Sequence, residues 1–167
     1  MRGGLSGSPS ATSAVKSSLA TTGGSPPFAF SRKQGKTPSG STGPSSGYGG
    51  SGFYYYAETS GRTKGNLFRL AYDGSACTSA GLVVASVGFS YHMYGSTIGK
   101  LEVKSSSDGA SWASEWVKEG NQGTAWTTAM VTSASGRLWS VTGTSGSSYT
   151  GDIPIDDLEL LTCAAPP

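Results

Sequence analysis

The side chains best suited to chemistry in this chain are the acidic ones of segment 152–157, which reads DIPIDD. If this segment is a strand, alternation places Asp157 on the inner face with the two isoleucines and turns Asp156 outward. A carboxylate on an inner face needs a cation or hydrogen bonds to compensate its burial. A Ca²⁺ ion takes about six to eight oxygen ligands, so Glu58 and backbone carbonyl groups would have to join Asp156 and Asp157. Alternatively, the aspartates accept backbone N–H groups and cap turns, and both interpretations stay open.

Residues typical of catalysis do not stand in catalytic patterns. His92 is the only histidine, and no serine, cysteine or acidic residue lies at a known catalytic spacing from it. Glu115 and Glu119 fall in a segment that we expect to be a strand, which does not arrange them as the carboxylate pair of a glycosidase. The motif His-Glu-x-x-His is absent. We therefore predict no catalytic residues and no enzymatic activity.

Three of the four tryptophans, Trp112, Trp116 and Trp126, are close together in the sequence. Flat aromatic surfaces on a β-sandwich suit the stacking of sugar rings, but large aromatic side chains equally form the core of a fold that is poor in Leu and Ile. Trp112 follows a turn and is the best candidate for an exposed binding residue. For the other two, a core position is the preferred interpretation.

The composition favours one all-β domain. The chain has 167 residues and 26 glycines, and only 13% of its residues are charged. Gly and Ser combined with β-branched and aromatic residues suit short strands and many turns rather than a helical bundle. The net charge of +2 is too small, and the basic residues too scattered, for nucleic acid binding. No apolar run approaches the ~20 residues of a membrane-spanning helix.

The centre of the chain, residues 89–126, is predicted to hold two strands joined by a turn. Apolar and polar side chains alternate in 89–94 and again in 100–104, as they do in half-buried strands. A turn is expected after the second segment, at 107–109, which reads SDG, because Asp bonds its own backbone and Gly tolerates positive φ. Further short strands are predicted along the chain, at 53–58, 67–70, 129–132, 138–142 and 153–161. Together they predict a β-sandwich of two antiparallel sheets.

Several of these segments carry the motifs of a known family. They are YHMYG at 91–95, IGxLxV at 98–103, GNQGxxW at 120–126 and GDIPIDDL at 151–158, preceded by TPS and TGP within 37–44. In this order they resemble the MAM domains, which are extracellular modules of meprins, neuropilins and receptor tyrosine phosphatases. The resemblance runs from residue 28 to 163 and implies a jelly roll. It also implies that the cation near Asp156 and Asp157 is one structural Ca²⁺ or Na⁺ ion.

The domain organisation follows from this resemblance and from composition. Residues 1–27 are rich in Ser, Gly, Thr and Pro, bury almost nothing, and are expected to be a disordered linker. The MAM-like domain is predicted to span 28–163, with 164–167 as a short tail. The N-terminus lacks the apolar run of a signal peptide, so we expect the chain to be a fragment of a longer secreted or surface protein.

The two cysteines, Cys77 and Cys163, show no metal-binding spacing. Many MAM domains have a cysteine just before the YHMY strand, where this chain has Ser86. The resemblance to an extracellular module implies a Cys77–Cys163 disulfide that pins the last strand to the sheet. Such a bridge would stabilise the fold by about 3–5 kcal/mol in the chain-entropy model. Two free, buried thiols are the alternative.

The function implied by the resemblance is that of a non-catalytic extracellular adhesion or recognition module, an ectodomain of a membrane or secreted protein. Its partner would be another protein or a second copy of itself, and a membrane would be reached only through the parent chain. Two alternatives remain open. One is a carbohydrate-binding module attached to a secreted enzyme, with a glycan as its partner, and the other is a structural spacer.

Overall fold

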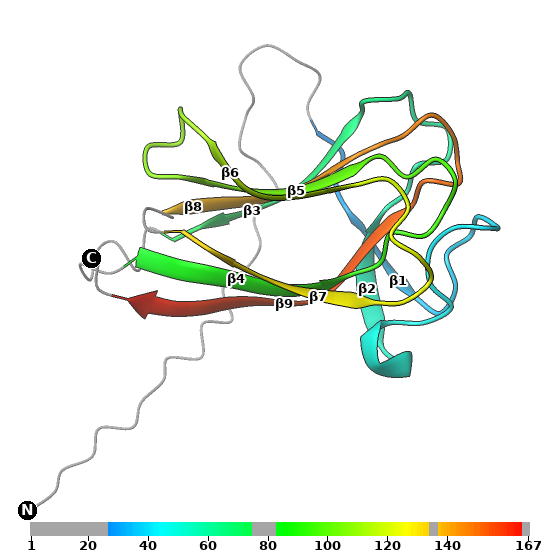
Figure 1. The fold of residues 1–167 in the computed structure, drawn as a ribbon, viewed down its shortest axis with the longest axis horizontal. Helices are drawn as coiled ribbons and strands as arrows, with labels where there is room; N and C mark the ends of the chain where they lie inside the picture. Colours follow the sequence, from blue (N-terminus) through cyan, green and yellow to red (C-terminus); the bar gives the residue numbers. More distant parts are fainter. Residues whose placement is uncertain (1–26, 75–82, 134–136, 165–167) are drawn as a thin grey trace, which may run out of the picture.

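The structure is a computed structural model that describes residues 27–74, 83–133 and 137–164. Its elements are β1 (Ser31–Gln34), the 3₁₀ helix η1 (Tyr48–Gly50), β2 (Phe53–Ala57), β3 (Leu67–Asp73), β4 (Val83–Tyr91), β5 (Lys100–Ser106), β6 (Ala113–Glu119), β7 (Thr127–Thr132), β8 (Leu138–Thr144) and β9 (Ile153–Ala164). Two antiparallel sheets, ordered β1-β2-β9-β4-β7 and β3-β8-β5-β6, face one another (Figure 1). The predicted all-β, jelly-roll β-sandwich is confirmed.

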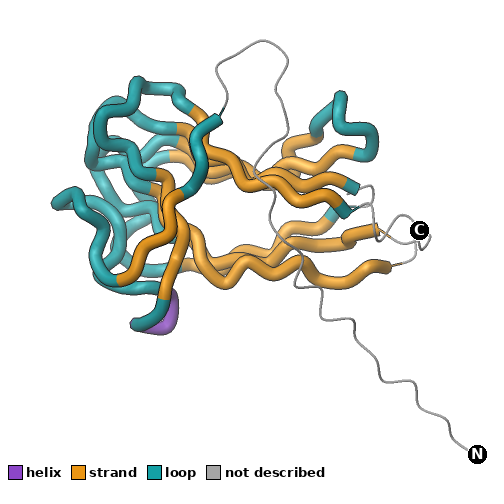
Figure 2. The backbone as a smooth tube through the Cα atoms, turned by 180° about the vertical axis from the view of Figure 1, so that it is seen from behind, coloured by secondary structure: helices purple, strands orange, loops and turns teal. Residues whose placement is uncertain are grey.

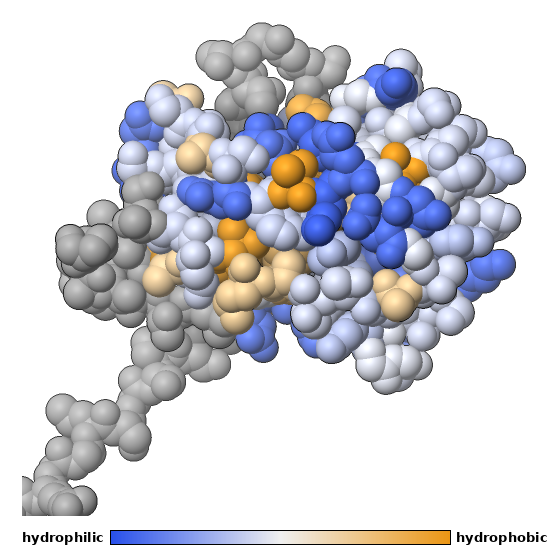
Figure 3. Space-filling model, in the orientation of Figure 1, coloured by the Kyte–Doolittle hydropathy of each residue, from blue (hydrophilic) through white to orange (hydrophobic). Residues whose placement is uncertain are grey.

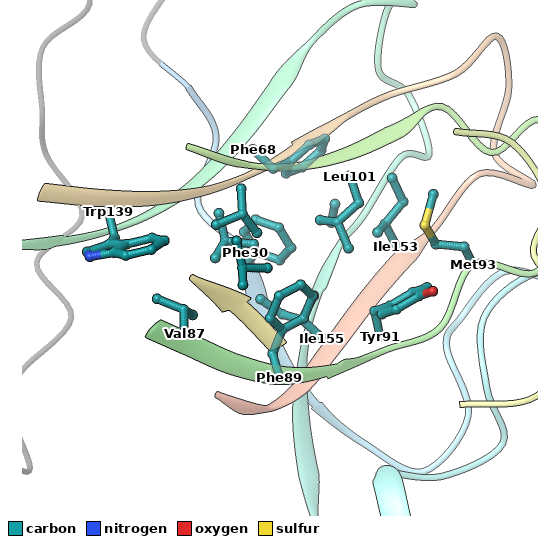
Figure 4. Packing of buried hydrophobic residues seen from close by; sticks show 14 of the residues in the cluster. Phe30, Phe68, Val87, Phe89, Tyr91, Met93, Leu101, Trp139, Ile153 and Ile155 are labelled. Carbon is teal, nitrogen blue, oxygen red and sulfur yellow. The ribbon is translucent and has the colours of Figure 1, made fainter. Parts of the chain in front are cut away.

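Alternation along the strands fills the space between the two sheets with apolar side chains. Val87, Phe89 and Tyr91 of β4 are buried, as are Leu101 and Val103 of β5 in the opposite sheet. Figure 4 shows labelled side chains from both sheets pointing toward one another across this space. Because each fully buried large apolar side chain stabilises the fold by about 1.5–3 kcal/mol, this layer is the main source of cohesion between the sheets.

The last strand occupies the middle of the five-stranded sheet. β9 pairs with β2 on one side and with β4 on the other, so that Ile155 stands opposite both Tyr55 and Tyr91. The pairs β1–β2 and β4–β7 are therefore joined into one sheet only through β9. This arrangement makes the final strand the connection between the two halves of the sheet.

Most described loops gather at one end of the sandwich, where β2 ends and β9 begins (Figure 2). The chain segments there approach one another at the backbone level. A β-carbon at Gly146 would clash with the backbone carbonyl oxygen of Thr97, so only glycine fits at this contact. The loops therefore form a packed cover rather than separate extensions.

Two details of the fold depart from regular strand pairing. The first sheet strand begins at Ser31, whereas Phe28 makes an isolated bridge with Phe68 before the chain crosses to the other sheet. In β9 the register shifts opposite Gly88 and Ser90, so the pairing skips over Asp157 and Leu158. Asp157 has a φ of 46° at this β-bulge and is exposed, so the prediction that strict alternation places it on the inner face is wrong.

Some predictions concern residues outside the described ranges. The segment 1–26, which is nearly all of the predicted linker, lies outside them, and so does Cys77. Cys163 lies in β9, where its backbone pairs with that of Val84. The Cys77–Cys163 disulfide therefore stays a prediction. In the described part of the chain, no helix is long and apolar enough to cross a membrane.

Candidate functional site

A buried carboxylate, that of Asp152, lies where the loops meet the start of β9. The residue is 0% exposed. Its Oδ1 atom accepts hydrogen bonds from the backbone N–H and the hydroxyl group of Thr59, at 3.0 and 3.1 Å. The backbone N–H of Asp152 donates to the hydroxyl oxygen of Thr42 at 3.0 Å. One residue thereby fixes two loops, far apart in sequence, to the central strand.

The second carboxylate oxygen of Asp152 is not compensated. Oδ2 has no hydrogen-bond partner among the described residues, although the atom is buried. Burial raises the pKa of Asp152 to about 6, and the negative charge of Glu58 raises it as well, against the hydrogen bonds from Thr59, which lower it. At neutral pH, when the carboxyl group of Asp152 is ionised, its buried charge therefore destabilises the folded state.

Three hydrogen bonds extend this site into the loop between β1 and β2. The hydroxyl group of Thr37 donates to the carbonyl oxygen of Thr42, and the hydroxyl group of Thr42 donates to the carbonyl oxygen of Tyr94, each at 3.0 Å. The backbone N–H of Gly43 donates to the same Tyr94 oxygen at 3.1 Å. Because both threonines are buried, these bonds hold the loop against the chain that leaves β4.

An aromatic cluster covers the outer side of the five-stranded sheet. It is formed by Tyr48, Tyr54, His92, Tyr94 and Trp126. The ring of Trp126 lies 5.5 Å from that of His92, 5.9 Å from that of Tyr54 and 6.3 Å from that of Tyr48. His92 is 2% exposed, its Nε2 atom lies 3.0 Å from the carbonyl oxygen of Thr124, and burial lowers its pKa. His92 is therefore enclosed within this cluster.

The three predicted metal ligands do not form one group. Glu58 accepts hydrogen bonds from the hydroxyl group of Tyr56 and the backbone N–H of Ser60. Asp156 accepts from the backbone N–H groups of Tyr48 and Asp157, which is the turn-capping role named as the alternative. Glu58 instead precedes Thr59, whose backbone N–H group bonds Asp152, and the charge of Glu58 raises the pKa of Asp152.

A metal site of three or more His, Cys, Asp or Glu side chains is not found among the described residues. The donor set that remains is the orphaned Oδ2 atom of Asp152 together with the carboxylate of Glu58, the residue before Thr59. Two carboxylates fit a small, hard cation such as Ca²⁺ or Na⁺ if backbone carbonyl groups or water complete the shell. The metal-ligand prediction for Asp156, Asp157 and Glu58 stays untested.

Trp112, the predicted glycan-binding residue, is only half-buried, and its indole N–H lies 3.3 Å from the carbonyl oxygen of Gly109. Larger exposed aromatic surfaces belong to three other residues, which no sequence pattern singles out. Phe53, Tyr55 and Tyr149 are 47%, 45% and 55% exposed. Alternation in β2 places aromatic side chains on both faces of the strand, but it does not show which face stays open.

Comparison with known proteins identifies the family. The family profile described as MAM domain, meprin/A5/mu, matches residues 24–164 of this chain. This chain is a member of the MAM domain family. The human MAM domain-containing glycosylphosphatidylinositol anchor protein 1 is 39% identical over 126 residues, which cover 71% of this MAM domain chain and 13% of that protein. The chain thus spans about an eighth of that relative's length.

Two further comparisons agree with the family and the fold. The MAM and fibronectin type III domain-containing protein 1 of Acropora millepora is 41% identical over 73 residues, covering 44% of this chain and 16% of that protein. The K2 cleaved adhesin domain of Lys-gingipain superposes with a TM-score of 0.57 at 14% identity, covering 81% of this chain and 84% of that one. At such low identity, the second comparison supports the fold alone.

Asp152 generates a prediction about pH. Its pKa is about 6 in the folded protein against 3.8 ordinarily, so the folded state binds the proton more tightly. The stabilisation of the fold by proton binding at Asp152 is present at low pH and is lost as the pH rises from about 4 through 6. Asp152→Asn keeps an oxygen for Thr59 and removes the charge. With a chelator in the buffer, the free energy of unfolding of this variant, relative to that of the wild type, should therefore increase by about 1–3 kcal/mol across this pH range.

Chemical denaturation between pH 4 and 7.5 measures this difference. Glu159→Gln, at an exposed position of β9, is the matched control and should follow the wild type at every pH. A difference between Asp152→Asn and wild type that does not change with pH would refute the assignment of an uncompensated charge to Asp152.

Proposed function

We propose that this MAM domain is a non-catalytic extracellular recognition module that acts through protein–protein contact, including self-association, within a larger surface or secreted protein. Family membership supports this proposal, as does the similarity to a human relative whose name describes a glycosylphosphatidylinositol anchor protein. Within the chain itself, self-association is favoured by the charge properties of one edge strand.

The four edge strands of the two sheets differ in charge. β1 carries Arg32 and Lys33, β3 carries Arg69 and Asp73, and β6 carries two glutamates and a lysine. β7 reads TTAMVT and carries no charged residue. Charged side chains on an edge strand oppose pairing with another chain, so among the described strands only β7 lacks this protection.

Side chains on β7 also favour contact. Met130 is 60% exposed and pairs in register with Gly88, which has no side chain to cover it. Figure 3 shows hydrophobic patches separated by hydrophilic side chains on one face of the molecule, so a broad apolar interface is not visible there. An added strand on β7 would use main-chain hydrogen bonds for affinity and Met130 for apolar contact.

Sedimentation velocity of the full 167-residue chain across concentration tests this proposal. The wild type should show reversible self-association, and Met130→Lys should weaken it about tenfold or more because it introduces charge at the centre of the edge. Val117→Lys is the matched control, because Val117 is 47% exposed on β6. A wild type that stays monomeric at all concentrations would contradict self-association and direct the search to a different protein or a glycan.

We also propose that one Ca²⁺ or Na⁺ ion binds at Asp152 and Glu58 and strengthens the loop cover. The ion would supply the positive charge that the orphaned Oδ2 atom lacks. A ligand that binds only the folded state raises the melting temperature with its concentration. Ca²⁺ or Na⁺ should therefore raise the melting temperature of the wild type but not of Asp152→Asn, with choline chloride as the ionic-strength control. Equal responses of the two proteins to both ions would refute this site.

A further inference from the structure

A cavity of ≈ 370 Å³ opens on the flank of the sandwich away from β7. Three of its walls come from strands: Leu70 of β3, Tyr55 of β2, and Ile155 with Leu158 of β9. The fourth wall is the segment through which the chain crosses from its bridge at Phe28 into β1. The cavity exists because β3 is an edge strand, whereas β9 continues into β2 and β1 on the other sheet.

The walls of this flank cavity are mainly apolar. Phe30 and Ile155 are buried at its base and lie in the space between the sheets (Figure 4). Leu70 and Leu158 are half-buried at its sides, and the ring of Tyr55 is 45% exposed. This volume lies in the usual range of ligand pockets, which are largely apolar with a few polar groups that fix the orientation of the ligand.

The charged groups of the flank cavity are both acidic. Asp156 and Asp157 contribute to its lining, and none of its lining residues is basic. Asp156 already accepts two backbone hydrogen bonds, whereas the carboxylate of Asp157 is exposed and accepts none from the described residues. Asp157 is therefore the group available to an incoming cation.

Backbone strain coincides with this position. Asp157 adopts a φ of 46°, in the left-handed region that non-glycine residues seldom occupy. The β-bulge at Asp157 and Leu158 turns the aspartate away from the core and leaves Leu158 among the cavity walls. Such strain is often found at binding sites, where it directs a side chain toward a ligand.

We propose that the flank cavity is a binding site for an apolar group that carries a cation. The apolar group, aromatic or branched aliphatic, would enter between Tyr55, Leu70 and Leu158. The ammonium or guanidinium group would remain at the mouth beside Asp157. A free amine offers this chemistry, and so does a polypeptide with Lys or Arg next to an apolar residue. The site is independent of the β7 edge and of self-association.

Three probes with one aromatic ring and different charges test the proposal by NMR titration of the ¹⁵N-labelled full chain. They are phenethylamine, 2-phenylethanol and 3-phenylpropionate, which are cationic, neutral and anionic. Shift changes should gather at Phe30, Tyr55 and Leu158. The cation should bind about two- to fivefold more tightly than the alcohol, because Asp157 is solvent-exposed, and the anion should bind more weakly than both. The blocked dipeptide acetyl-Lys-Phe-amide then separates the sources: tighter binding than phenethylamine indicates a polypeptide, and weaker binding a free amine.

Two variants assign the effect to the flank cavity. Asp157→Asn keeps a side chain that tolerates positive φ and should remove the preference for the cation while leaving alcohol binding unchanged. Ala29→Trp, at an exposed lining position, should block all three probes, whereas Ala113→Trp on β6 should not. Absence of shifts at the cavity, or a cation preference that survives in Asp157→Asn, would overturn the proposal, whatever the result of sedimentation.

Discussion

The structure depends on the insertion of β9, the last strand, between β2 and β4. Until β9 pairs with both neighbours, β1–β2 and β4–β7 are two separate antiparallel pairs that cannot bury their apolar faces as one sheet. The pairing joins residues far apart in sequence, such as Tyr55 and Ile155, so closing the loop between them has a large entropic cost. Packing of Ile153 and Ile155, each at most 1% exposed, offsets this cost.

Both candidate sites arise from how β9 begins and how it is interrupted. At its start, Asp152 lies beneath the loops and exchanges hydrogen bonds with Thr42 and Thr59, so the loop cover is fixed to the strand. In its middle, the bulge at Asp157 leaves a carboxylate at the mouth of the flank cavity. The β7 edge lies on the far side of β4, so an added strand there would disturb neither site.

The sequence predicted the elements well because alternation of apolar and polar residues records burial directly. It predicted the strands around Phe89 and Leu101, the SDG turn and the family, which later comparison confirmed. It failed where a tertiary contact decides the outcome. Strict alternation cannot show an inserted residue, so Asp157 was placed on the inner face. The burial of Asp152 depends on loops whose packing no local pattern indicates.

Native-state hydrogen exchange of the full chain tests the central role of β9 most directly. If β9 holds the sheet together, the paired amides of β9 and β4 exchange only through global unfolding, so their opening free energy equals the stability measured by denaturant. Edge strands such as β1 should exchange earlier, through local opening. If β9 amides instead opened well below the global free energy while β5 and β8 stayed protected, the last strand would not be what holds the sheet together.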